Sequence, residues 1–199
     1  MPDKPIIEFE AGCYYHIYNH GNSSDNLFVE NANYYFFLKR LNYFTQDIID
    51  LNAWCLLPNH FHLLIRVKEN FINKENIEVE INHKIVSEQF RHFFTSYSKA
   101  INKKYNRRGA LFLRSFKRKK VTDDVYLKRV IRYIHMNPVN HGFTKDPLKW
   151  HHSSFNKIIE NPNYLPNKEI IGLFRDLQDF VEFHRGKVNS QIKETDVNK

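Results

Sequence analysis

The chain has 199 residues, 42% hydrophobic and 15% aromatic, which suffices for one domain with a buried core and excludes a largely disordered protein. Thirty lysines and arginines against 22 acidic residues give a formal charge of +8, which favours a polyanionic partner or an acidic membrane surface. No apolar run approaches the roughly 18 residues that span a bilayer, and the start lacks a signal-peptide pattern, so we expect a soluble cytoplasmic protein. Cys13 and Cys55 lie too far apart in sequence to indicate a disulfide framework or a cysteine-rich zinc site.

The first half of the chain alternates strand and helix patterns. Residues 12–20 alternate aromatic and polar side chains, which predicts a strand followed by a turn cluster. Apolar residues at helical spacing predict a helix over 31–47. Residues 48–67 predict two strands, or one interrupted strand, with a break at Pro58, and the polar stretch 69–83 predicts a long exposed loop.

The second half continues this alternation. It predicts a helix over about 87–104, a strand over 110–121, a helix capped near Thr122 and ended by Pro138, a loop-rich stretch after Gly142, and an amphipathic helix over 169–184. The polar residues from Lys187 onward predict a disordered tail. This order of elements favours an α+β fold, an antiparallel sheet with helices packed on it.

A pair of histidines is the first candidate site. His60 and His62 are two positions apart in a predicted strand, so their side chains project from one face about 7 Å apart and can converge on a cation. Cys55 is an odd number of positions earlier, which disfavours a Cys-His-His zinc site in an unbroken strand. Because the chain contains 11 histidines, a His-x-His pair also arises readily by chance.

A tyrosine and an asparagine form the second candidate. Tyr133 and Asn137 are four positions apart in a predicted helix, so a nucleophile and an oxygen ligand lie on one helical face. Two imidazoles and an amide oxygen suit Mg²⁺ or Mn²⁺, and also Zn²⁺. The simpler interpretation is a partly buried tyrosine near a helix end and an ordinary residue before proline.

The third feature is a basic segment, residues 103–120, that contains no acidic residue. Its cations are Lys103, Lys104, Arg107, Arg108, Arg114, Lys117, Arg118, Lys119 and Lys120. Aromatic residues lie between them, which suits a phosphate backbone with unpaired bases, although a solvated face of a basic protein is the plainer alternative.

Five segments, in this order, together resemble the HUH single-tyrosine transposases, and especially the REP-associated tyrosine transposases of bacteria. They are YHIYNHGN at 15–22, LPNHFHLL at 57–64, YNRRGALF at 105–112, YIHMNPV at 133–139 and WHHSSF at 150–155. His20 and Leu113 depart from the pattern, where arginine and glutamine are more usual.

The resemblance implies a ferredoxin-like catalytic domain over 1–160, with a C-terminal helix and polar tail over 161–199 outside the match. It implies that Tyr133 forms a 5′-phosphotyrosine link on single-stranded or hairpin DNA and releases a 3′-hydroxyl, while Asn137 completes the metal site of His60 and His62. The metal would be Mg²⁺ or Mn²⁺, and a homodimer is compatible with the wider family. His16 and His20 share a strand face and are expected to be structural or to contact DNA.

Two other functions fit the same residues. One is a catalytically silent, domesticated DNA-binding protein of this fold. The other is a metal-dependent hydrolase of a small phosphoester with Tyr133 in the core, which would turn over without a covalent intermediate and bind with little dependence on salt.

Overall fold

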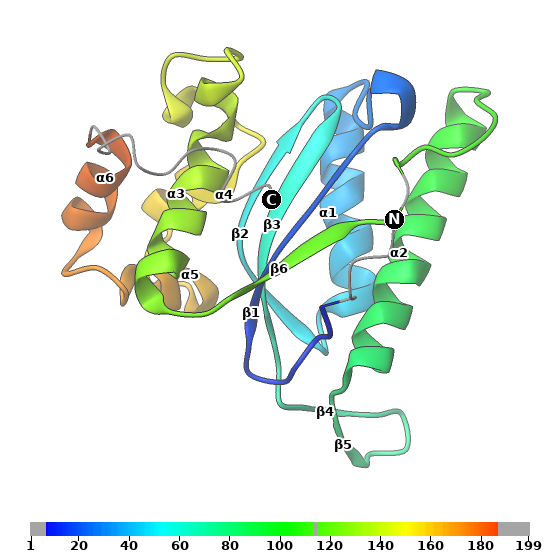
Figure 1. Cartoon of the computed structure of the whole chain (residues 1–199), viewed down its shortest axis with the longest axis horizontal. Coiled ribbons are helices and arrows are strands. Elements are labelled where there is room, and N and C mark those ends of the chain that lie inside the picture. Colours follow the sequence, from blue (N-terminus) through cyan, green and yellow to red (C-terminus); the bar gives the residue numbers. More distant parts are fainter. Residues whose placement is uncertain (1–6, 114, 187–199) are drawn as a thin grey trace, which may run out of the picture.

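Four antiparallel strands form the central sheet in the computed structural model, which describes residues 7–113 and 115–186 (Figure 1). The strand order is β2 (Ile49–Leu57), β3 (His60–Val67), β1 (Tyr14–His20) and β6 (Lys117–Val121). Helices α1 (Asn31–Thr45) and α2 (His83–Lys104) connect them in the order β1-α1-β2-β3-α2-β6, which is the ferredoxin-like arrangement. The predicted α+β fold with an antiparallel sheet is confirmed.

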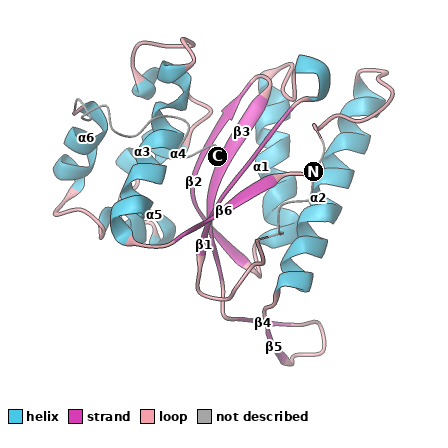
Figure 2. Ribbon diagram, in the orientation of Figure 1, coloured by secondary structure: helices cyan, strands magenta, loops and turns pink. Residues whose placement is uncertain are grey.

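Helices cover both faces of this sheet (Figure 2). α1 and α2 pack on one face. The other face carries α3 (Asp124–Asn140), α4 (Ser154–Glu160), α5 (Leu165–Ile171) and α6 (Leu177–Arg185). No described helix is long and apolar enough to cross a membrane.

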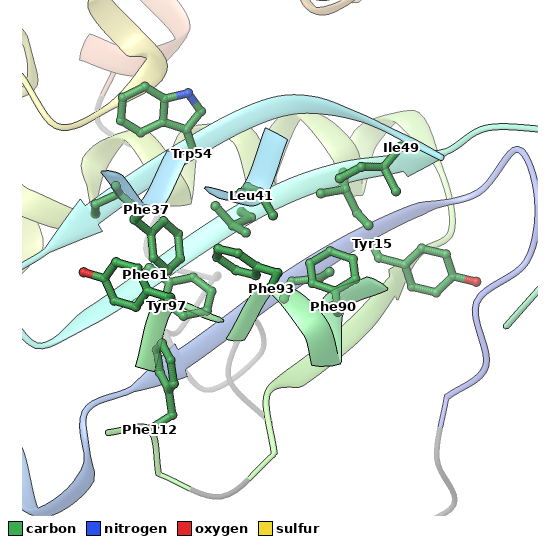
Figure 3. Packing of buried hydrophobic residues seen from close by; sticks show 14 of the residues in the cluster. Tyr15, Phe37, Leu41, Ile49, Trp54, Phe61, Phe90, Phe93, Tyr97 and Phe112 are labelled. Atoms are coloured by element: carbon green, nitrogen blue, oxygen red, sulfur yellow. The ribbon is translucent and has the colours of Figure 1, made fainter. Parts of the chain in front are cut away.

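An aromatic layer fills the space between the sheet and the pair α1 and α2. Phe37, Phe61, Phe93 and Tyr97 are fully buried and meet at ring-centroid distances near 5 Å, with Phe37 against Phe61 at 5.1 Å and against Phe93 at 4.9 Å (Figure 3). Rings in this geometry gain attraction beyond their burial. This layer therefore holds the strands in register.

Side-chain caps define where the helices on both faces begin. Glu30 and Asn33 form a reciprocal capping box at the start of α1. Asn82 accepts a hydrogen bond from the backbone N–H of Ile85 in α2, and Asp123 accepts one from Tyr126 in α3. The N-terminal boundary of α3 thus follows from local sequence, whereas α2 begins at His83, one turn before the predicted start.

The predicted end of the third helix at Pro138 is wrong, because α3 continues to Asn140. A proline removes one backbone donor and crowds the carbonyl four residues earlier, which costs most in a helix interior. Here the last turn closes with the His141 N–H donating to the Asn137 carbonyl at 3.0 Å. A proline in the last turn therefore has little effect on where the helix ends.

Two strand predictions need correction. The stretch 69–83 is not a plain loop, because β4 (Asn70–Ile72) and β5 (Glu78–Glu80) form a hairpin there. The predicted strand over 110–121 is confined to β6, preceded by an isolated bridge between Phe112 and Gly21.

The C-terminal prediction of one helix over 169–184 is also wrong. α5 ends at Ile171, and α6 begins after Asp176, whose side chain accepts a hydrogen bond from the Asp179 N–H at 2.8 Å. Local capping therefore divides one amphipathic pattern into two helices. The stretch after Gly142 contains α4 as well as a short 3-10 helix, Pro147–Lys149, and a second 3-10 helix, Asn22–Ser24, occupies the early turn cluster. The tail from Lys187 lies outside the described residues.

Candidate active site

The register of β1 against β3 gathers histidines on the face of the sheet that α3 covers. Tyr18 pairs with His62 and His20 pairs with His60, so alternate residues of both strands share this face. The short Pro58-Asn59 turn lets β2 and β3 pair up to Leu57 and His60. Both histidines of the predicted metal site are buried, with His60 3% and His62 2% exposed.

Helix α3 brings the other two candidate residues to this histidine pair. Asn137 Oδ1 is 3.0 Å from His60 Nε2. The ring of Tyr133 meets His62 edge-on at a centroid distance of 5.3 Å, and His16 at 5.9 Å. The four side chains that the sequence singled out therefore converge at one place, where Tyr133 is 9% exposed.

The protonation of His60 bears on whether this place suits a cation. Its Nδ1 is 2.8 Å from Asn59 Oδ1 and its Nε2 is 3.0 Å from Asn137 Oδ1, yet a neutral imidazole donates from only one nitrogen. With the proton on Nδ1, the Nε2 lone pair faces an acceptor oxygen, and buried Asn137 Nδ2 has no hydrogen-bond partner among the described residues. A cation shared by Nε2 and Oδ1 satisfies both acceptors. A separation of 3.0 Å matches neighbouring ligands of an octahedral ion with bonds of about 2.1 Å.

Burial keeps the histidines in the form that binds metal. It lowers the pKa of His60 to about 4 and holds the pKa of His62 well below its usual value. Neutral imidazoles have a free lone pair and need lose no proton on binding an ion. Burial raises the pKa of Tyr18 on the same face, and the neighbouring hydroxyls of Tyr133 and Tyr126 raise it further.

His16 contacts the pair directly, a role that its sequence position did not reveal. Its side chain is fully buried, and its Nε2 lies 2.9 Å from His62 Nδ1. A proton on His62 Nδ1 donated to His16 leaves His62 Nε2 available as a ligand. Partners of this kind orient metal-bound histidines.

Two further histidines flank His60. His20, which is exposed, stacks on its ring at 4.8 Å, and His141, just after α3, meets it at 4.7 Å. Sequence reasoning missed His141, because nothing local to the end of α3 indicates that it returns to the start of β3.

The parity argument about Cys55 does not hold in the structure. β2 and β3 are separate paired strands, so Cys55 lies directly opposite His62 and shares its face. Burial raises the pKa of its thiol and keeps it protonated, which makes it a poor ligand. Within the described ranges, no group of three histidine, cysteine, aspartate or glutamate side chains is placed to hold a metal, so the candidate set depends on the asparagine amide.

Comparison with known proteins gives one similar sequence and one similar fold. No family model matches the sequence. A protein of Haemophilus influenzae assigned to the REP-associated tyrosine transposases is 31% identical over 115 residues, covering 56% of this chain and 62% of the relative's length. The chain is similar in sequence to this relative and spans less than two thirds of its length. A solved REP-associated tyrosine transposase bound to a REP hairpin has the same fold, with a TM-score of 0.63 and 18% identity over 84% of this chain and 90% of that one.

The basic segment of the chain divides between the two faces of the sheet. Lys117 and Lys119 pair with Tyr18 and His16, which places them on the face of the candidate site. Arg118 projects to the opposite face, where its guanidinium lies 4.5 Å from the ring centroid of Phe9. β6 is an edge strand, so its two lysines border the candidate site directly.

Several cations of the basic segment already have acidic partners from distant parts of the sequence. Lys104 pairs with Glu30, Arg107 with Asp25, and Lys120 with Glu10. Lys103 and Arg108 are exposed near the end of α2. Arg114 lies outside the described residues. The segment is thus less uniformly available to a polyanion than its composition indicates.

Proposed function

We propose that this protein is a metal-dependent endonuclease and strand transferase that cuts single-stranded DNA with Tyr133 as the nucleophile. The observation that carries the proposal is the meeting of a tyrosine, two neutral imidazoles and an amide oxygen at one buried place. The relationship to REP-associated tyrosine transposases supports the same chemistry.

His60, His62 and Asn137 would hold the metal, Mg²⁺ or Mn²⁺. The ion, when bound, supplies a positive charge that polarises a phosphate oxygen and stabilises the charge that develops during displacement. In the tautomers that bind metal, the His60 Nδ1 proton would be donated to Asn59 Oδ1 and the His62 Nδ1 proton to His16 Nε2, which would leave both Nε2 atoms with lone pairs for the ion. These contacts prepare the ligands before the ion arrives.

The reaction transfers a phosphodiester without consuming water. The Tyr133 hydroxyl oxygen forms a bond to phosphorus while the bond to the DNA 3′-oxygen breaks. The phenol gives up its proton, and the departing 3′-oxygen takes one up, so a 5′-phosphotyrosine and a 3′-hydroxyl result. Since the new phosphoester conserves bond energy, a later 3′-hydroxyl can displace Tyr133 and rejoin the strand.

Single-stranded or hairpin DNA is the partner that best fits the charge of the chain. The solved protein of this fold is bound to a REP hairpin. Lys117 and Lys119 at the rim of the site are the cations best placed to position the scissile phosphate. Lys103 and Arg108, which are exposed near the end of α2, would contact phosphates of the DNA farther from the site. Arg118 and Lys120, which face the N-terminal segment, would contribute less.

A covalent-adduct assay tests this function. The intact protein is incubated with Mn²⁺ and a labelled hairpin oligonucleotide that carries a single-stranded flank, and the products are separated under denaturing conditions. We expect a protein–DNA adduct that is lost in Tyr133→Phe and on chelation of the metal. Binding without any adduct would instead identify a catalytically silent DNA-binding protein, and cleavage without an adduct would identify a hydrolase.

A further inference from the structure

Helix α6 lies against the side of α3 that faces away from the sheet (Figure 1). Its hydrogen bonds reach Arg132 and His135, which lie one position before and two positions after Tyr133. Arg132 donates hydrogen bonds to the carbonyls of Phe183 at 3.0 Å and Gly186 at 2.8 Å, which caps the C-terminal end of α6. His135 lies 2.9 Å from His184 of α6 through its Nδ1. The C-terminal region is therefore hydrogen-bonded to the turn of α3 that carries the proposed nucleophile.

The Phe180 carbonyl fixes the hydrogen-bond order of the two histidines in the chain that begins at His184. Its Nδ1 is 2.7 Å from the Phe180 carbonyl, which can only accept, so the proton sits there and His184 Nε2 is an acceptor. His135 must then donate from Nδ1, which makes its Nε2 an acceptor for the hydroxyl of Ser154 at 2.8 Å. Ser154 Oγ in turn accepts the backbone N–H of Trp54 at 2.8 Å.

This chain joins α6 to α3, α4 and strand β2 in the buried interior. His135 is fully buried, and His184 and Ser154 are 1% and 4% exposed. Phe180 and Phe155 pack around the two imidazoles, with Phe180 4.4 Å from the His184 ring centroid. Because the His135 side chain is fully buried, loss of its acceptor leaves a buried N–H unpaired, which is unfavourable.

We propose that His184 is a positioning residue for the DNA-cutting reaction: it fixes the rotation of α3 through His135, and so places Tyr133 and Asn137 against the histidine pair. This inference rests on the function proposed above. His135 and Tyr133 are two positions apart and therefore face nearly opposite sides of the helix. A turn of α3 that relieves an unpaired His135 displaces Tyr133 from the site on the other side.

Four substitutions separate positioning from simple stabilisation. His184→Leu removes the acceptor, and His184→Gln retains an acceptor oxygen that His135 can reach. Phe180→Leu reduces the apolar packing around His184 but leaves the hydrogen-bond chain intact. Gln178→Leu is a matched exposed change on α6.

The experiment measures three quantities for each variant of the full chain: the dissociation constant for a hairpin oligonucleotide, the rate of adduct formation at saturating DNA and Mn²⁺, and amide hydrogen exchange across α3. We expect His184→Leu to slow adduct formation by about tenfold or more, since small misplacements of a nucleophile reduce rate steeply. Its DNA affinity should stay within about twofold, and His184→Gln should recover much of the rate. Phe180→Leu and Gln178→Leu should keep the rate near that of the parent.

Other outcomes overturn the inference. One is a parental rate in His184→Leu, and another is a parallel loss of rate and stability in His184→Leu and Phe180→Leu. If the parent protein forms no adduct, the proposed function fails separately, and hydrogen exchange decides the question. Faster exchange around Tyr133 in His184→Leu than in Gln178→Leu supports the positioning role, and equal exchange contradicts it.

Discussion

The two faces of the central sheet differ in chemistry, although strand β3 contributes side chains to both. In β3, Phe61, Leu63 and Ile65 enter the aromatic layer under α1 and α2, whereas His60 and His62 point toward α3. The aromatic face is closed by apolar contacts. The histidine face buries neutral polar rings, which is unfavourable unless each finds a partner. Stability and chemistry are therefore separated by a single residue step along one strand, and substitutions on the two faces should affect different measurements.

The largest expected effect is on the histidine face. Tyr133→Phe removes the only nucleophilic atom of that ring and keeps its packing against His62. We expect complete loss of the covalent adduct, while the melting temperature stays close to that of the parent. Denaturing gels and thermal unfolding measure the two quantities. An adduct of parental yield in this variant would assign the nucleophile to another residue.

On the aromatic face, Phe61→Ala should act on stability instead. The ring is fully buried and contacts Phe37 at 5.1 Å, so its removal should lower the free energy of unfolding by about 3–5 kcal/mol. Denaturant titration measures this. At a temperature where the variant remains folded, the adduct rate should be near parental. A large loss of rate in the folded variant would show that the two faces are not separable.

Removal of a partner of the metal ligands should have an intermediate effect. His16→Phe keeps a ring in the buried position and removes the acceptor for His62 Nδ1. We expect Mn²⁺ affinity to fall roughly 10–100-fold, as is usual when such partners are lost. Isothermal titration of the apo protein measures it, and His20→Phe, which alters a stacked ring without this contact, is the control. Unchanged affinity in His16→Phe would assign His16 to packing alone.

The smallest expected effect concerns the edge strand β6. Lys117→Gln with Lys119→Gln removes two cations from the face of the site, and Arg118→Gln with Lys120→Gln removes two from the opposite face. The first pair should weaken binding of a single-stranded oligonucleotide and lower its salt slope by about 1.4, at roughly 0.7 for each lost phosphate contact. The second pair should change the slope less. Equal effects would point to net charge rather than to a defined path for DNA.

Much of the architecture follows from local sequence. The alternation of His60, Phe61 and His62 indicates a strand with two different faces, and the four-residue spacing of Tyr133 and Asn137 indicates one helical face. Asp123 marks the start of α3 because a capping side chain acts within a few residues of itself. Where capping acted against an apolar pattern, as at Asp176, periodicity alone misled.

Contacts between distant segments were decided by tertiary structure. Periodicity shows which residues share a face, but not which strand lies opposite, so the pairing of His16 with His62 and the position of Cys55 depended on register. Lys104 and Arg107 of the acid-free segment lie next to Glu30 and Asp25 only in the folded chain, because ion pairs need proximity in space rather than in sequence. The link from His184 to His135 joins residues 49 positions apart, and packing of α6 on α3 alone creates it. Sequence by itself thus determined the main strands and helices of the sheet layer and the chemical groups they carry, and the fold decided which of these groups meet.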